Sequence, residues 1–74
     1  MDVEWDERKR QANISKHGID FVAAAKIFDG PILEIADRRR DYGEARFQVL
    51  GEFGGEVIYL VYTWRGRRRR IISA

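Results

Sequence analysis

The sequence predicts an α+β fold, with two N-terminal helices packed on one face of an antiparallel sheet of about four strands. Two observations predict this class. Helix-capping residues and a helical apolar stripe are confined to residues 6–28, whereas alternating and β-branched segments separated by glycine turns occupy residues 32–74. The chain has 74 residues, so we expect one domain spanning residues 1–74.

The two helices are indicated by their end signals. A first helix is expected over Asp6–Lys16, because the aspartate side chain can accept the free N–H groups of the first turn and Gly18 can adopt the left-handed stop. Asp20 is a second N-cap candidate. Apolar residues then recur at i, i+3, i+4 and i+7 over Phe21–Phe28, which predicts a second helix, and Asp29–Pro31 ends it.

The rest of the chain is predicted to be strands joined by turns. The expected strands are Asp2–Trp5, Ile32–Ala36, Arg46–Phe53, Glu56–Trp64 and Arg67–Ala74. Glu56–Trp64 is the most apolar and β-branched of them and is expected at the centre of the sheet. Asp37–Ala45 is polar and is expected to be a loop.

Two short glycine turns set the expected register. Gly54–Gly55 would pair Phe53 with Glu56, and a turn at 65–66 would pair Trp64 with Arg67. One face of the sheet would then meet the second helix, and it carries Phe47, Val49, Phe53, Ile58, Leu60, Tyr62, Trp64 and Ile71. The other face would stay open, and it carries Arg46, Gln48, Leu50, Val57, Tyr59, Val61, Thr63, Arg68, Arg70 and Ile72.

Composition narrows the function classes. The chain has no cysteine and one histidine, so we expect no disulfide, no ordinary zinc site and no cofactor. It shows no signal peptide and no membrane-spanning apolar run, so a cytoplasmic protein is expected. The net charge is only +2, but arginines cluster at 38–40 and 65–70, which suggests a basic surface that meets phosphate. A solvated, salt-bridged surface is the alternative.

A series of residues runs along nearly the whole chain at the spacings of one protein family. The series is Trp5, Asp6, Asn13, Lys16, His17, Gly18, Phe21, Ala24, Phe28, Asp29, Pro31, Asp37, Gly43, Glu44, Arg46, Tyr62, Thr63, Arg70, Ile71, Ile72, Ser73 and Ala74. In this the sequence resembles the BrnT toxins. Members of that family usually continue past the Ile71–Ala74 motif, so the resemblance describes this chain as short at its C-terminus.

The resemblance implies both a fold and a function. The fold would be similar to that of RelE toxins. The protein would cleave RNA and halt growth, and a BrnA-type antitoxin from the adjacent gene would neutralise it. Promoter DNA would be bound only through the toxin–antitoxin complex, with the antitoxin supplying the DNA-binding element. No membrane partner is implied.

Cleavage of RNA without a metal ion needs three kinds of group. A base must take the proton of the 2′-hydroxyl, cations must stabilise the phosphorane, and the 5′-oxygen must be helped to leave. Arg46 and Arg70 are the candidate phosphate clamps, and their alternative role is to keep an exposed sheet soluble. Glu44 is a candidate base or a salt-bridge partner of Arg46, and His17 is a candidate acid or base or a helix cap.

Four further residues are candidate substrate contacts. Arg68 shares the predicted open face with the phosphate clamps, and Tyr59 on that face could stack a base or simply pack on the sheet. Arg38 and Arg39 in the loop could bind backbone phosphate or an acidic antitoxin.

Three functions compete on this sequence. The first is a metal-independent endoribonuclease toxin. The second is a catalytically inactive RelE-like module that only binds the antitoxin or nucleic acid. The third is a DNA-binding protein, which the absence of a basic recognition helix beside a turn disfavours.

Overall fold

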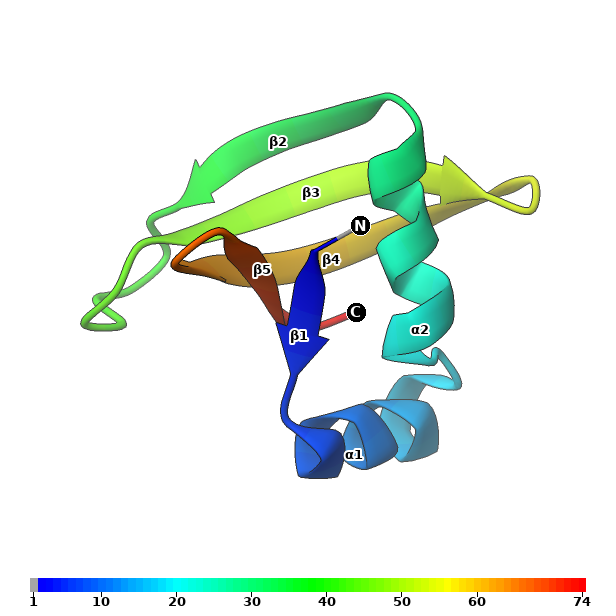
Figure 1. Cartoon of the computed structure of the whole chain (residues 1–74), viewed down its shortest axis with the longest axis horizontal. Coiled ribbons are helices and arrows are strands. Elements are labelled where there is room, and N and C mark those ends of the chain that lie inside the picture. The colour runs from blue at the N-terminus through cyan, green and yellow to red at the C-terminus, as the bar shows by residue number, and fades with distance from the viewer. Residues whose placement is uncertain (1) are drawn as a thin grey trace.

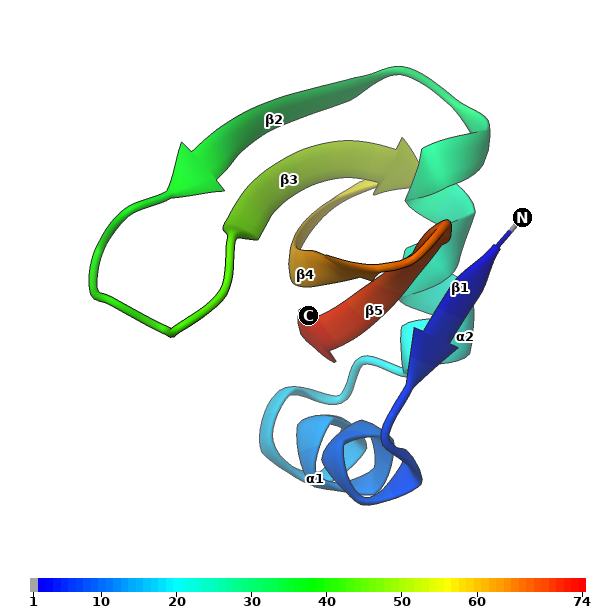
Figure 2. The same cartoon turned by 60° about the vertical axis from the view of Figure 1, so that its left-hand side comes forward.

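The frame of the molecule is a mixed sheet with a helical segment laid across one face (Figures 1 and 2). A computed structural model describes residues 2–74. Its elements are β1 (Val3–Trp5), α1 (Glu7–His17), α2 (Phe21–Ala24), the 3₁₀ helix η1 (Ala25–Asp29), β2 (Ile32–Asp37), β3 (Arg46–Phe53), β4 (Glu56–Arg65) and β5 (Arg68–Ser73). Within the described residues the strand order is β1-β5-β4-β3-β2, so β4 is central as predicted.

The strand predicted at Asp2–Trp5 is present as β1, but it adds a fifth, parallel strand to the sheet, so a wholly antiparallel sheet of about four strands was wrong. β1 pairs in parallel with β5, placing Val3 opposite Arg69 and Trp5 opposite Ile71. This pair joins the two ends of the chain. Turn residues report only on strands that are neighbours in sequence, so they carried no signal for it.

Helix α1 has the predicted ends but not the predicted place. Asp6 accepts a hydrogen bond from the N–H of Arg8, and Gly18 ends the helix at φ 70°. The helix lies beyond the ends of β1 and β5 rather than on the sheet face (Figure 1). The amide of its buried Asn13 donates to the carbonyl of Ala74 and accepts from the N–H of that residue, which ties α1 to the end of β5.

The second helical segment covers the sheet. Asp20 caps it as predicted, but the α-helical winding lasts only to Ala24 and then tightens into η1, so a continuous helix over Phe21–Phe28 was wrong. The segment supplies four of the nine residues of the core, which joins it to β3, β4 and β5. The buried cluster is Phe21, Ala24, Ala25, Ile27, Val49, Ile58, Leu60, Tyr62 and Ile71.

The register keeps both predicted faces even though one turn differs. Phe53 pairs with Glu56 as predicted. The second turn is Gly66–Arg67, so Trp64 pairs with Arg69 and not with Arg67. Because this shifts β5 by two residues, Arg68, Arg70 and Ile71 stay on the faces assigned to them. Beyond Ile71 the pairing is irregular, since Val61 pairs with Ser73, so the prediction for Ile72 does not follow from the register.

An ion pair between α1 and the start of α2 fixes their relative position. The guanidinium of Arg10 donates from Nε and Nη2 to the two carboxylate oxygens of Asp20, each at 2.8 Å. These hydrogen bonds, with one from the N–H of Val22, lower the pKa of Asp20 from 3.8 to about 2. The ionised form of Asp20 therefore contributes to the stability of the folded state.

We predict that Gly51→Ala destabilises the fold by about 1–3 kcal/mol. A Cβ added at Gly51 would lie 2.6 Å from the Cβ of Ile27, so η1 would have to lift from β3. Gly30→Ala is the matched control, since a Cβ there meets nothing within 4 Å. Urea unfolding of both variants measures the difference, and equal stabilities would contradict the close packing.

We also predict that Asp20→Asn lowers the melting temperature at pH 7. Asparagine keeps the helix cap but not the charge. Because the folded pKa lies below 3.8, the ion pair stabilises the parent fully above that pH, and the stabilisation is lost as the pH falls toward about 2. Thermal melts between pH 7 and pH 2 should show the two proteins converging; a constant difference would exclude the ionised carboxylate as its cause.

Candidate functional site

The open face of the sheet gathers charged side chains at one end. This end, called here the arginine end, is where β2 and β4 finish and β3 and β5 begin. A cross-strand row there places Arg46 opposite Thr63 and Thr63 opposite Arg70. Neighbouring strands lie about 4.8 Å apart, so two arginines flank the central threonine on one surface.

The carboxylate of Glu44 lies between two arginines at this end, Arg46 and Arg65. Its Oε2 accepts from Nε of Arg46 at 3.0 Å, and its Oε1 lies 3.7 Å from Nη2 of Arg65. The guanidinium carbon of Arg46 also lies 4.2 Å from the ring centroid of Tyr42. The Glu44 and Arg46 side chains are each about a quarter exposed, so the stacked, paired guanidinium is held in place and yet reachable from solvent.

Arg70 has its own acidic partner. Its Nη1 donates to Oε2 of Glu4 on β1 at 2.6 Å. Thr63, between the two arginines, donates from Oγ1 to the carbonyl oxygen of Ala45 at 2.6 Å. Glu4 was not among the predicted site residues, because its place beside Arg70 depends on the parallel pairing of β1 with β5.

Asp37 organises the loop that leads into this site. Its side chain is fully buried and accepts from Nε and Nη2 of Arg39 at 2.9 and 2.8 Å, and from the hydroxyl of Tyr42 at 3.2 Å. The hydrogen bonds from Arg39 hold the pKa of Asp37 well below its usual range. Beside it lies a hollow of about 350 Å³ lined partly by Arg38 and Arg46.

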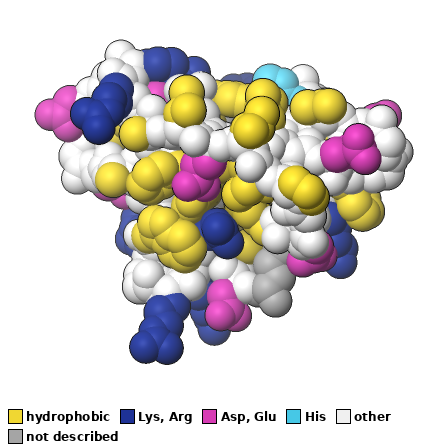
Figure 3. Space-filling model, turned by 90° about the horizontal axis from the view of Figure 1, so that it is seen from above, with side chains coloured by type: hydrophobic (Ala, Val, Ile, Leu, Met, Phe, Trp, Pro, Cys, Tyr) yellow, Lys and Arg dark blue, Asp and Glu magenta, His cyan; other side chains and the backbone are white. Residues whose placement is uncertain are grey.

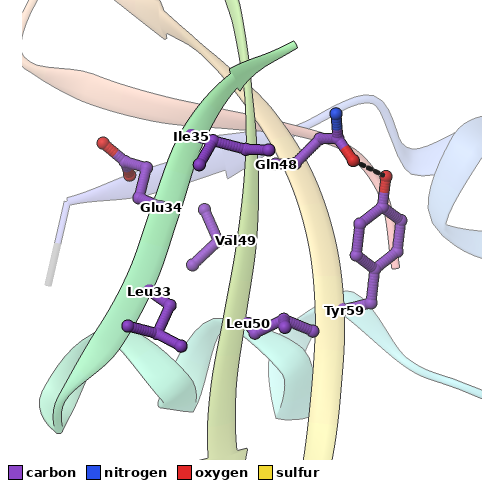
Figure 4. A pocket seen from close by; sticks show the side chains of 7 residues that line it. All are labelled: Leu33, Glu34, Ile35, Gln48, Val49, Leu50 and Tyr59. Atoms are coloured by element: carbon purple, nitrogen blue, oxygen red, sulfur yellow. Dashed lines mark hydrogen bonds between the residues drawn. The ribbon is translucent and has the colours of Figure 1, made fainter.

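The structure brings together some of the predicted site residues. Arg46, Glu44 and Arg70 meet at the arginine end, and Arg68 lies there opposite Arg65. Tyr59 lies farther along the open face and donates its hydroxyl to Oε1 of Gln48 at 3.0 Å (Figure 4). Arg38 is exposed on the loop and Arg39 is occupied by Asp37.

His17 is not part of this group. It is exposed in the last turn of α1, whose buried Asn13 is tied to Ala74 at the far end of β5. Its place in the last turn of α1 is the predicted one, where a positive charge would interact favourably with the helix end, but the cap residue is Gly18. The predicted capping role of His17 stays a prediction.

A second polar group lies on the helix-covered side of the sheet. The hydroxyl of buried Tyr62 donates to Oε1 of Glu34 at 2.6 Å, and burial raises its pKa. The guanidinium carbon of Arg69 lies 4.3, 5.2 and 4.8 Å from the ring centroids of Phe28, Tyr62 and Trp64. Tyr62 was expected on the face that meets the second helix, and it lies in the core there. The roles of Glu34 and Arg69 were missed.

Neither a metal-binding cluster nor a membrane-spanning helix is found among the described residues. Across residues 2–74, histidine, aspartate and glutamate side chains form no cluster of three suited to a metal ion. In the same part of the chain, each helix is too short or too polar to cross a membrane.

Fold and site together define a small α+β protein whose arginines, paired with glutamates, gather at one end of an uncovered sheet face. A model of the BrnT family, described as the ribonuclease toxin of type II toxin–antitoxin systems, matches residues 5–74. The chain therefore belongs to the BrnT family. This membership implies an antitoxin partner. A search of curated proteins found no match to the chain.

Proposed function

We propose that this chain is an endoribonuclease that cleaves RNA without a metal ion, arrests growth, and is neutralised by a BrnA-type antitoxin in the cytoplasm. The observation that carries the proposal is the row Arg46–Thr63–Arg70 with Glu44 against its first member. Promoter DNA would be bound only through the antitoxin complex. The proposal includes a fold similarity to RelE toxins, which the helix-covered sheet with one open face supports.

The arginines are suited to the phosphate. Guanidinium groups bind phosphate oxygens through paired hydrogen bonds and remain charged at any physiological pH. Arg46 and Arg70 stand on either side of Thr63, so one phosphate over the threonine can contact both. Arg68 and Arg38, both exposed at this end, would hold neighbouring phosphates, and Tyr59 would stack a base farther along the face.

Glu44 is the proposed general base. As the phosphate binds Arg46, it displaces the guanidinium from Glu44 and frees the carboxylate, 3.0 Å from Nε in the unbound protein. The carboxylate removes the 2′-hydroxyl proton, the 2′-oxygen bonds to phosphorus, and the bond from phosphorus to the 5′-oxygen breaks. A proton from water completes the 5′-hydroxyl, leaving a 2′,3′-cyclic phosphate, while the arginines stabilise the phosphorane charge.

A second candidate function is a binding module without catalysis. It is favoured by one observation, namely that Glu44 and Glu4 already neutralise Arg46 and Arg70. In that case the arginines would serve the sheet structure, and RNA would not be cut.

We predict that the parent cleaves a long RNA in excess EDTA and that Arg70→Ala reduces the rate by at least about 100-fold, because a lost cation leaves the phosphorane less stabilised. Glu4→Gln is the matched variant, since it breaks the same ion pair but leaves the cation. We expect it to retain cleavage. Equal loss in both variants, with folding intact by circular dichroism, would assign Arg70 a structural role.

We predict that Glu44→Gln abolishes most cleavage while RNA binding measured by fluorescence anisotropy stays near the parent value. Glutamine keeps the shape of the side chain but cannot take a proton. Arg8→Ala, on an exposed side chain of α1, controls for purification. Loss of binding and cleavage together would point to positioning instead of base catalysis.

We expect His17→Gln to retain cleavage, because the structure keeps His17 apart from the arginine end. The same assay in EDTA tests it. A loss as large as that of Arg70→Ala would return His17 to the site and would mean that RNA reaches across to α1.

A further inference from the structure

The open face carries an apolar strip of which the proposed RNA site uses only Tyr59. The strip consists of Leu33, Ile35, Leu50, Val57 and Tyr59. Three of these aliphatic side chains are largely exposed, with Leu33 at 74%, Ile35 at 64% and Val57 at 72%. Figure 3, which views the molecule from above, shows apolar side chains spread over the surface on the β2 side. So much aliphatic surface in so small a protein indicates a partner.

The strip has regular rows that lead to the arginine end. Leu33, Leu50 and Tyr59 lie opposite one another on β2, β3 and β4. The next row toward the arginine end starts with Ile35, and the row after that contains Asp37, Arg46 and Thr63. Successive rows lie about 7 Å apart along the strands.

Between the strip residues the face is hollowed. A depression of about 420 Å³ is lined by Leu33, Ile35, Leu50 and Tyr59 among others, and Figure 4 shows these side chains around it. The three strands that form it span about 10 Å, which matches the width of an α-helix with its side chains. Aliphatic side chains offer no surface for stacking a base, so they suit a protein better than RNA.

We propose that the strip is the docking surface for an amphipathic helix of the antitoxin, with apolar residues over the strip and acidic residues over the arginine end. The proposal rests on the proposed function, because it takes the antitoxin as the partner that must block the RNA site. Charge complementarity supports it, because arginines outnumber carboxylates at that end, whereas Glu52 and Glu56 lie at the other end of the strands. The residues of the basic end are Arg38, Arg39, Arg40, Arg46 and Arg65 against Asp37, Asp41 and Glu44.

The spacing of the rows sets where acidic residues must lie on the docked helix. A helix rises about 1.5 Å per residue, so an acidic side chain about five residues beyond the last apolar contact reaches from the Ile35 row to the Arg46 row. There it meets cations that otherwise face RNA phosphate. A helix bound at the strip would therefore also block RNA binding at the arginine end.

The test uses a purified BrnA-type antitoxin as the probe and measures its affinity for four toxins by titration calorimetry. Leu33→Lys and Ile35→Lys place a charge in the proposed contact, and we expect each to weaken binding about tenfold or more. Val22→Lys is the control, because Val22 is an exposed apolar residue of α2 outside the strip. We expect it to bind like the parent. Circular dichroism checks that every variant folds.

Two further measurements separate the possible outcomes. In the absence of antitoxin, the strip variants and the parent should cleave RNA at the same rate. If the parent does not cleave RNA but the strip variants lose affinity for the antitoxin, the docking site is supported and the proposed function is contradicted. Unchanged antitoxin affinity in both strip variants overturns the proposal. If the affinity for the antitoxin is unchanged but RNA binding falls, the strip is an RNA-binding surface. If the affinity for the antitoxin is unchanged and sedimentation shows that the parent is a dimer whereas the variants are monomers, the strip binds a second copy of the chain.

Discussion

The close contact between η1 and β3 sets how the molecule is layered. Gly51 lets the backbone of β3 approach Ile27, whose side chain is fully buried, at a distance that any Cβ would prevent. With the helical segment held there, Phe21 and Leu60 complete a core on that side of the sheet. The strand alternation then directs every second residue of β3, β4 and β5 to the opposite face, where nothing from the described chain covers it.

Arginines on the covered face and on the open face of the sheet have different surroundings. On the covered side, the half-buried Arg69 lies against three aromatic rings, and its Nε is buried without a hydrogen-bond partner among residues 2–74, so ring contacts take the place of a carboxylate partner. On the open side, Arg46 and Arg70 are paired with carboxylates that solvent can still reach. The first arrangement stabilises the fold, whereas the second can exchange its partners for a ligand.

Local patterns in the sequence were enough to assign both faces. Alternation over Arg46–Phe53 and the glycine turn after it predict the register of β3 with β4. The predicted register of β4 with β5 was wrong by two residues, and an even shift leaves side chains on the same face. The β1–β5 pair could not be predicted, because it joins residues about 66 positions apart without any local signal. Glu4 was therefore missed beside Arg70, and so was the link from Glu44 to Arg65, which depends on where the loop places the carboxylate.

The glutamates beside the arginines would affect how the proposed RNA binding depends on ionic strength. If a phosphate took the place of Glu44 on Arg46, the RNA would release condensed cations, but the freed carboxylate would attract cations in turn. The same exchange would occur at Arg70 with Glu4. The logarithm of the binding constant would thus fall with the logarithm of salt concentration less steeply than the number of arginine–phosphate contacts implies, so a shallow slope would hide a larger interface.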